Sequence, residues 1–222
     1  MRGIWGRRNA FIFEKVFGSP GKVVRLALLS LEEHQEANNR REAGQEIREG
    51  NRMDRKWKRP MPGLYKLNFD AAVDLKNRRI GIGIVIRDSN GEVMVTVCSR
   101  KDHVISPFIA ECQALKRSID LCKELGFGAV MMEGDAKGMI ETVLAKEADE
   151  SEYGQLIEDT KRAFAQGIHW SLSFIHREGN SVAHSLAKKA LLTDTELCWI
   201  EESPQEVIQK IVYDRNCNFL TL

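Results

Sequence analysis

The sequence predicts an α/β fold in which a mixed five-stranded sheet is flanked by helices. Two observations lead to this prediction. After Gly63 the hydrophobic pattern takes a period of two residues through three successive segments, which is typical of an antiparallel meander. After Ser106 helical and strand patterns alternate, which indicates helices that cross the faces of the same sheet. The expected order is βββαβαβα, with the crossover between the fourth and fifth strands divided into two helices.

The meander consists of three expected strands, over residues 64–73, 80–87 and 92–100. In the first strand Leu67 and Phe69 point to one face, whereas Lys66, Asn68 and Asp70 point to the other. The second and third strands are joined at Asp88-Ser89-Asn90-Gly91. Asn-Gly supplies the positive φ angles that a tight hairpin needs, so the two strands are expected to pair antiparallel.

The second half of the domain begins with a helix. Ser106 is a favourable N-cap and Pro107 suits the first helical turn, while Gly126 marks the end of the helix. Apolar residues along this segment recur with the helical period, which indicates one buried face. The remaining expected elements are a strand over 129–132, helices at about 137–146 and 153–166, a strand over 168–176 and a helix over 180–192.

Composition divides the chain into three parts. Residues 1–60 are expected to form a helical, basic N-terminal extension and linker, with an apolar helix over 23–31 and a charged stretch over 32–49. A boundary near Pro60 separates this extension from a main domain over 61–192. Residues 193–222 form a C-terminal tail, in which the spacing of Val207, Ile208, Ile211 and Val212 indicates a short amphipathic helix.

Charge is distributed unevenly along the chain. Residues 1–60 hold 14 Lys and Arg against 8 Asp and Glu, whereas the remainder holds 19 against 24. A basic arm beside an acidic domain is common in nucleic-acid enzymes, but a solvated charged helix explains the pattern equally well. The basic run from Arg48 to Arg59, which includes Trp57, suits phosphate contact and base stacking. It also suits a nuclear-targeting patch or a plain linker.

The five cysteines have no CxxC or zinc-ligand spacing, which favours a reducing compartment over a disulfide framework. The apolar cluster at residues 11–13 is interrupted by Glu14 and Lys15, so no secretory signal is expected. No segment reaches the ~18 apolar residues that span a membrane. We therefore expect a soluble, intracellular protein with no membrane partner, in the nucleus or the cytoplasm, and acting as a monomer.

Three acidic residues stand at unusual places for their type. Asp70 lies within a strand, Glu111 lies early in a helix near its apolar face, and Asp135 follows a short apolar strand. Carboxylates that converge repel one another, so they require a cation, and oxygen ligands favour Mg²⁺ or Mn²⁺ over zinc. Two such ions can promote phosphodiester cleavage. Each residue also has a simpler interpretation: Asp70 as an edge-strand charge, Glu111 as a complement to the helix dipole and Asp135 as an N-cap.

Five separated blocks of sequence carry a family resemblance. The blocks are Lys66–Asp70, Gly81–Asp88, Ala110–Leu115, Glu133–Asp135 and Arg177–Ala187. Together they resemble the ribonuclease H-like domain of plant reverse transcriptase-like proteins, in the same order and over residues 64–192. Residues 4–14 are similar to the segment before this domain in plant non-LTR retrotransposon polyproteins. The chain is too short to hold a polymerase as well, so it resembles a tail fragment or a domesticated copy.

The resemblance implies a fold of the ribonuclease H type-1 superfamily and an endonuclease that hydrolyses the RNA strand of RNA–DNA hybrids. It implies that Asp70 bridges two metal ions, Mg²⁺ or Mn²⁺, and that Glu111 and Asp135 bind mainly the second. The hybrid is expected to be recognised by its shape, phosphates and 2′-hydroxyl groups.

His184 occupies the position at which the family's enzymes usually have a fourth acid. An imidazole is a poorer Mg²⁺ ligand than a carboxylate, so as a replacement ligand His184 predicts weakened activity and a preference for Mn²⁺. The alternative is a catalytically inactive nucleic-acid-binding module from a domesticated retrotransposon. His184 is also compatible with an ordinary polar helix position. A protein-interaction remnant with no nucleic-acid role is a third hypothesis, which the three carboxylates disfavour.

Two further departures from the family concern local structure. Ala71 follows Asp70 where the family often has glycine, which indicates a different local backbone. The loop from His176 to Asn180 is short and leaves little room for the mobile histidine loop of bacterial-type enzymes. His176 is the residue that could replace that loop's histidine.

Overall fold

The fold is built on a six-stranded sheet in the order β5-β4-β1-β2-β3-β6. The computed structural model describes residues 55–104, 106–147 and 153–217. The strands are β1 (Tyr65–Asp74), β2 (Arg79–Arg87), β3 (Val93–Asp102), β4 (Ala129–Gly134), β5 (His169–Phe174) and β6 (Leu197–Ile200). Strands β1, β2, β3 and β6 pair antiparallel, while β4 runs parallel to both β1 and β5. The predicted mixed sheet and its element order are confirmed, and β1 is a central strand.

The sheet differs from the prediction in having a sixth strand. Strand β6 pairs antiparallel with β3, with Val97 opposite Cys198. Only four residues form this strand, and four residues are too few to give a recognisable period-two pattern. The helix predicted in the tail is present as α7 (Gln205–Cys217), with Val207 and Ile211 buried.

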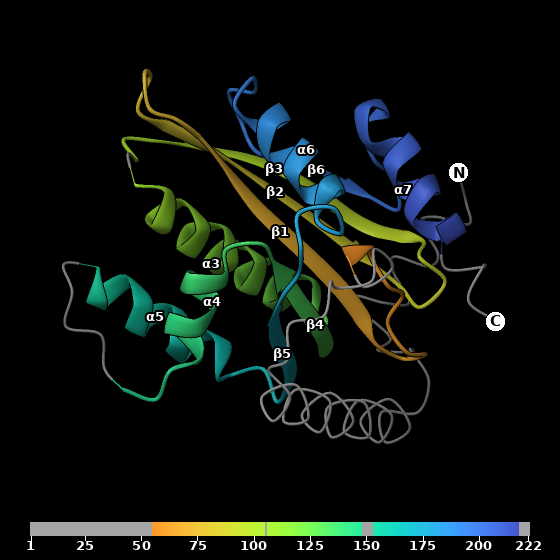
Figure 1. Cartoon of the computed structure of the whole chain (residues 1–222), viewed down its shortest axis with the longest axis horizontal. Helices are drawn as coiled ribbons and strands as arrows, with labels where there is room; N and C mark the ends of the chain where they lie inside the picture. The colour runs from red at the N-terminus through yellow and green to blue at the C-terminus, as the bar shows by residue number, and fades with distance from the viewer. Residues whose placement is uncertain (1–54, 105, 148–152, 218–222) are drawn as a thin grey trace, which may run out of the picture.

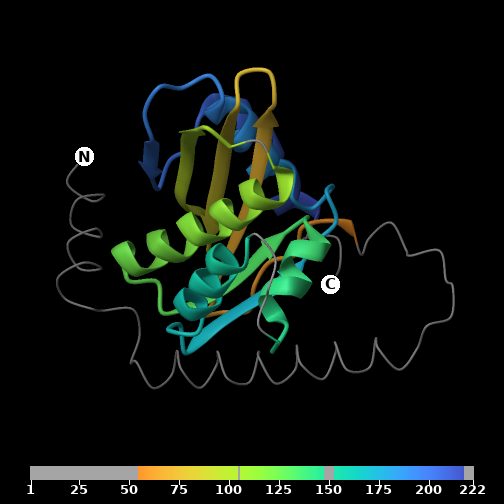
Figure 2. The ribbon, with the colours of Figure 1, turned by 90° about the vertical axis from the view of Figure 1, so that its left-hand side faces the viewer.

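Helices cover both faces of the sheet. On one face lie α3 (Pro107–Leu125), α4 (Lys137–Leu144) and α5 (Gly154–Phe164), and on the other lie α6 (Ser181–Ala190) and α7 (Figures 1 and 2). Helix α3 begins where the sequence predicts: the Ser106 side chain accepts a hydrogen bond from the Ile109 N–H, and Gly126 ends the helix in the left-handed conformation. The bounds predicted for the helices over 137–146, 153–166 and 180–192 agree with those of α4, α5 and α6 to within two residues.

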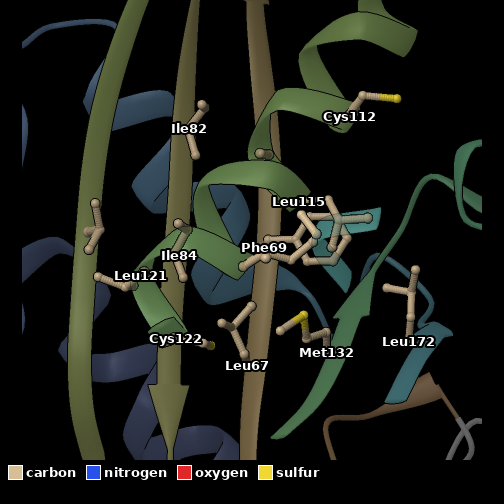
Figure 3. Packing of buried hydrophobic residues seen from close by; sticks show 14 of the residues in the cluster. Leu67, Phe69, Ile82, Ile84, Cys112, Leu115, Leu121, Cys122, Met132 and Leu172 are labelled. Atoms are coloured by element: carbon tan, nitrogen blue, oxygen red, sulfur yellow. The ribbon is translucent and has the colours of Figure 1, made fainter. Parts of the chain in front are cut away.

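The larger core lies between the sheet and α3. Leu67 and Phe69 of β1, with Ile82 and Ile84 of β2, pack against Leu115 of α3 (Figure 3). These strand residues occupy alternate positions, so they share one face of the sheet. Strand β1 is buried on its opposite face as well, because α6 and the segment before β1 cover it. Polar residues on that face are therefore withdrawn from solvent.

Helix α6 lies directly on the backbone of β2. A Cβ atom built on Gly83 would lie 2.2 Å from the Ala183 carbonyl oxygen, and one on Gly81 would lie 2.1 Å from the Ala187 carbonyl oxygen. Only glycine allows such an approach, so these two residues set the distance between α6 and the sheet. Gly83 is also the partner of Asp70 across the β1–β2 pairing, so α6 is close to Asp70.

A buried polar cluster joins the two ends of the described chain to the sheet. Trp57, 1% exposed, lies under the Arg87 guanidinium at 3.7 Å from ring centroid to Cζ, and its indole N–H donates to Asn68 Oδ1 at 2.9 Å. Arg87 forms an ion pair of 2.7 Å with Asp214 of α7. The remaining members are Lys66 and Glu133, which pair at 2.7 Å. These contacts extend beyond both expected domain boundaries, at residues 61 and 192.

Several expectations concern residues that the structure does not describe. The apolar helix expected over residues 23–31, the charged stretch over 32–49 and the similarity of residues 4–14 lie outside the described residues. Within the described residues, no helix is both long and apolar enough to cross a membrane.

Candidate metal centre

Three carboxylates from different elements converge where β4 ends beside the middle of β1. Asp70, Glu111 and Asp135 each offer an oxygen, and these three atoms lie within 4.8 Å of one another. They come from the middle of β1, the second turn of α3 and the residue after β4. The structure thus brings together the three acids that the sequence singles out, although they are far apart in the chain.

Asp70 is a buried acid on a central strand. The strand order places β1 between β4 and β2, and the residue is only 2% exposed, so the edge-strand interpretation is wrong. Burial raises the pKa of Asp70 to about 6, the hydrogen bond from His184 opposes this increase, and the negative charge of Asp135 adds to it. A carboxylate in such surroundings is stabilised by a positive charge.

Glu111 is the fifth residue of α3, beyond the first turn, so the helix-dipole interpretation does not apply. It accepts a hydrogen bond from the Ala71 N–H. Its Oε2 atom is buried and has no hydrogen-bond partner among the described residues. Burial, with the negative charges of Asp70 and Asp135, raises the pKa of Glu111 to about 9. An unpartnered carboxylate oxygen beside two further acids is the kind of group that a cation satisfies.

Asp135 lies in the connection between β4 and α4. The N-cap residue of α4 is Ala136, and no side chain caps this helix, so the N-cap interpretation of Asp135 is wrong. Gly134 directly precedes it, and a Cβ there would lie 2.5 Å from the Phe69 ring. The close packing of Gly134 against Phe69 keeps the end of β4, and with it Asp135, next to the part of β1 that carries Asp70.

His184 contacts the carboxylate cluster directly. Its Nδ1 lies 2.8 Å from Asp70 Oδ2. One nitrogen of the Arg177 guanidinium lies 3.3 Å from Nδ1 and 3.1 Å from Nε2 of the same ring. At these distances, a guanidinium nitrogen in the plane of the ring would collide with Cε1, which lies between the two ring nitrogens. The Arg177 nitrogen therefore lies over the face of the His184 ring. The fourth position of the site therefore holds an imidazole covered by a guanidinium.

The donor set fits divalent cations that prefer oxygen. Ligands of one Mg²⁺ lie at ~2.0–2.1 Å from the ion and so at most about 4.2 Å apart. The observed limit of 4.8 Å between carboxylate oxygens requires a contraction of under ~1 Å. The unpartnered Glu111 Oε2 supplies an available acceptor. Asp70, Glu111 and Asp135 are thus the residues of the described chain that could hold Mg²⁺ or Mn²⁺.

The sequence did not single out two residues of this region, Arg177 and Asn180. Arg177 contacts His184, and its positive charge lowers the pKa of Glu111 against the larger effects that raise it. Asn180 is fully buried and donates from Nδ2 to the Phe69 carbonyl oxygen at 2.9 Å. Both lie in the Arg177–Ala187 block of the family resemblance, which was the one signal for them; their residue types alone carried none.

The structure also bears on the expectations for Ala71, His176 and Trp57. Ala71 is not among the described residues with positive φ, so its position does not require glycine, and a local backbone that differs from the family's stays a prediction. His176 is exposed, and its ring packs edge-on against Phe174 at 5.1 Å between centroids, outside the carboxylate group. Trp57 is buried, so it is not available to stack on a base as the basic run suggested.

Comparison with known proteins is consistent with this geometry. The reverse transcriptase-like family model matches residues 68–190, which is more than half of the chain. This range contains all three carboxylates and His184. No curated protein matches the chain significantly.

Solved structures with a similar fold include three ribonucleases H1. The LC11 enzyme, isolated from compost by a metagenomic approach, is 19% identical with a TM-score of 0.51, over 58% of this chain and 98% of that chain. The enzyme of the archaeon Halobacterium salinarum is 21% identical with a TM-score of 0.50, over 58% and 97%. The LC9 enzyme, a type 1 ribonuclease H with the type 2 active-site motif, is 12% identical with a TM-score of 0.53, over 71% and 87%. The chain therefore belongs to the reverse transcriptase-like family, and its described domain has the ribonuclease H-like fold.

Proposed function

We propose that this protein is a metal-dependent endonuclease that hydrolyses the RNA strand of RNA–DNA hybrids. The observation that carries the proposal is the convergence of Asp70, Glu111 and Asp135 with their oxygens within 4.8 Å. Burial and mutual repulsion raise the pKa of both Asp70 and Glu111, so the arrangement is unfavourable until positive charge is supplied. The fold similarity to ribonucleases H1 supports the same reaction class.

Each acid has a proposed role. Asp70 would contribute to both cation positions, and Glu111 and Asp135 would hold mainly the second. Two divalent cations bound in this way activate water and stabilise the leaving oxygen in phosphodiester hydrolysis. The central strand and α3 keep the carboxylates in place, because both elements belong to the main core.

His184 and Arg177 modify the site. His184 hydrogen-bonds to Asp70 and replaces a carboxylate, so the site has one negative charge fewer and favours Mn²⁺ over Mg²⁺. Arg177 is exposed at the rim of the site, with its guanidinium over the His184 ring. A guanidinium at this place would attract the phosphate of a bound strand towards the carboxylates.

The test uses the full-length chain, because Trp57 and α7 are both part of the folded sheet assembly. A labelled RNA–DNA hybrid is incubated in Mg²⁺ and, separately, in Mn²⁺, with Asp70→Asn as the matched inactive control. We expect cleavage of the RNA strand that is stronger in Mn²⁺ and absent in Asp70→Asn. Cleavage that persists in Asp70→Asn would reject the assigned site.

The second candidate is a catalytically inactive module that binds nucleic acid. The specific observation in its favour is the His184–Asp70 hydrogen bond, which occupies a carboxylate oxygen otherwise available to a cation. This candidate predicts hybrid binding that weakens as salt rises, with no cleavage in either metal. Restoration of cleavage by His184→Asp would identify His184 as the cause.

The origin of the chain, its oligomeric state and its cellular compartment are proposed as well. We propose a plant non-LTR retrotransposon as the source of the chain, and a monomeric protein in a reducing intracellular compartment. Size-exclusion chromatography with light scattering tests the monomer, and imaging of a tagged chain tests the compartment.

A further inference from the structure

Helix α6 lies on β2 through a close contact between glycines and alanines. Gly81 and Gly83 of β2 face the backbone of α6, and the facing helix residues include Ala183 and Ala187. Away from β1 the helix is held by Leu186, which packs with Val85 and Cys98, and Cys98 Sγ donates to the Leu186 carbonyl oxygen at 3.3 Å. The contacts of α6 with β1 then decide how closely His184 approaches Asp70.

Asn180 provides a contact of this kind at the start of the helix. Its Nδ2 donates to the Phe69 carbonyl oxygen at 2.9 Å, and Phe69 is the residue before Asp70 in β1. The parallel pairing of β1 with β4 ends at Asn68 opposite Glu133, one residue before this carbonyl. At the other end of the same helical turn, the His184 N–H donates to the Asn180 carbonyl oxygen at 3.0 Å. Asn180 and His184 are thus one turn apart, and their two targets are adjacent in β1.

The Asn180 side chain is not explained by helix capping or by stability. It occupies the N-cap position of α6 but makes no side-chain capping bond. Its Oδ1 is buried without a hydrogen-bond partner among the described residues. The cost of this unsatisfied acceptor offsets the gain from the Asn180–Phe69 hydrogen bond, although loss of the side chain would also leave the Phe69 carbonyl oxygen without this donor. Its contribution lies in where it holds α6.

We propose that Asn180 is a positioning residue, which fixes α6 along β1 and so holds the His184 imidazole against Asp70. The kinetic part of this inference rests on the proposed function, whereas the geometric part does not. Within the described part of the chain, the Asn180 side chain hydrogen-bonds to Phe69 and to none of the three carboxylates. It acts through His184.

The geometric test is a spectroscopic one on the metal-free, full-length chain. The imidazole nitrogens of His184 are observed by long-range ¹H–¹⁵N correlation and assigned with His184→Ala. We expect Asp70→Ala to shift the Nδ1 signal to that of a nitrogen without a hydrogen-bond partner, and Asn180→Leu to shift it in the same direction. The control is Ser118→Ala, which removes a buried 2.9 Å hydrogen bond within α3 and should leave the signal unchanged. An unchanged Nδ1 signal in Asn180→Leu would overturn the proposal.

The kinetic test separates positioning from folding. Asn180→Leu removes the unsatisfied Oδ1 but leaves the Phe69 carbonyl oxygen without its Asn180 donor, so the melting temperature should change little. In contrast, kcat on the hybrid should fall about 10- to 100-fold at an unchanged KM. The double variant with His184→Ala should be no slower than His184→Ala alone, because Asn180 acts through that residue. Additive losses would contradict the proposal. If the leucine variant does not fold, Asn180→Ala decides both tests. If the wild type does not cleave, the proposed function fails while the spectroscopic test still decides the role of Asn180.

Discussion

His184 Nδ1 lies 2.8 Å from Asp70 Oδ2, so a helix on one face of the sheet is bonded to one of the three carboxylates of the acidic group. Asp70 is 2% exposed, and the imidazole supplies a partner that solvent does not. The same bond removes one carboxylate oxygen from those free to hold a cation. The His184–Asp70 hydrogen bond therefore stabilises the metal-free protein but lowers the affinity of the site for a metal ion.

The first prediction concerns this opposition. His184→Asp replaces the imidazole with a carboxylate next to Asp70, and like charges in a buried site repel. We expect the metal-free variant to lose about 1–3 kcal/mol of unfolding free energy, and Mg²⁺ to restore it. Urea unfolding with EDTA and with Mg²⁺ measures both effects.

The matched control for this change is His184→Asn, which keeps a neutral polar side chain and should lose less stability without metal. Its stability should not depend on Mg²⁺ more than that of the wild type. Equal metal responses of the aspartate and asparagine variants would contradict the assignment of residue 184 to the site.

The second prediction concerns the acid with the largest pKa increase that the site shows. The pKa of Glu111 is raised from 4.5 to about 9, so the metal-free folded state holds its proton more tightly than the unfolded state does. The resulting stabilisation is complete below pH 4.5 and is lost as the pH rises towards 9. Glu111→Gln should remove this loss. We expect a gain of about 2 kcal/mol at pH 8, below the full linkage value because solvent reaches part of the site.

Denaturant titrations of metal-free protein between pH 5 and 9 test this expectation. Glu141→Gln, a change at an exposed residue of α4, serves as the control and should alter the unfolding free energy by less than ~0.5 kcal/mol at every pH. A wild type whose stability rises with pH across this range would show that Glu111 is not held in the protonated form.

The third prediction concerns competition between protons and cations. The pKa of Asp70 is raised to about 6 and that of Glu111 to about 9, so at pH 5.5 both groups are largely protonated, whereas at pH 8 Asp70 is ionised. Ligands must lose their protons to bind a metal ion, and a bound ion stabilises the folded state. Mn²⁺ should therefore raise the melting temperature more at pH 8 than at pH 5.5. Differential scanning fluorimetry measures this, with Asp70→Asn expected to show no metal-dependent increase at either pH.

The sequence was sufficient for much of the fold because local patterns and tertiary requirements agree. The Asn90-Gly91 turn, the Ser106 cap and the alternation of Leu67 and Phe69 each determine structure within a few residues. Strand β6 was missed because its four residues depend on pairing with β3 rather than on their own pattern. Trp57 was assigned to a basic linker because its neighbours are charged, although contact with Arg87 buries it.

The site was predictable only in part for a related reason. Asp70, Glu111 and Asp135 stand at positions where acids are unusual, so they were visible individually. The contact between His184 and Asp70 depends on how closely α6 approaches β2, which Gly81 and Gly83 permit. That approach is a tertiary property, and no pattern local to residues 177–184 reports it. Arg177 and Asn180 remained without roles for this reason.

The last prediction concerns the buried polar cluster. Asp214→Ala would leave the Arg87 guanidinium, fully buried, without its 2.7 Å partner, and removal of one member of a buried pair typically costs ~3–5 kcal/mol. Trp57→Ala removes the ring beneath the same guanidinium and should cost about 3–5 kcal/mol. Because both variants disturb Arg87, their combined cost should be smaller than the sum of the two. Urea unfolding of the single and double variants measures this coupling.

Glu178→Gln is the matched control, since its ion pair with Arg55 is exposed and 3.7 Å long, and it should cost less than ~1 kcal/mol. The cluster also joins residues that lie on both sides of the domain boundaries predicted at residues 61 and 192. A chain that begins at residue 61 lacks Trp57 and leaves Asn68 Oδ1 with one donor fewer, so it should unfold at lower urea than a chain that begins at residue 55. Equal midpoints for the two chains would mean that the segment before Pro60 packs on the sheet without stabilising it.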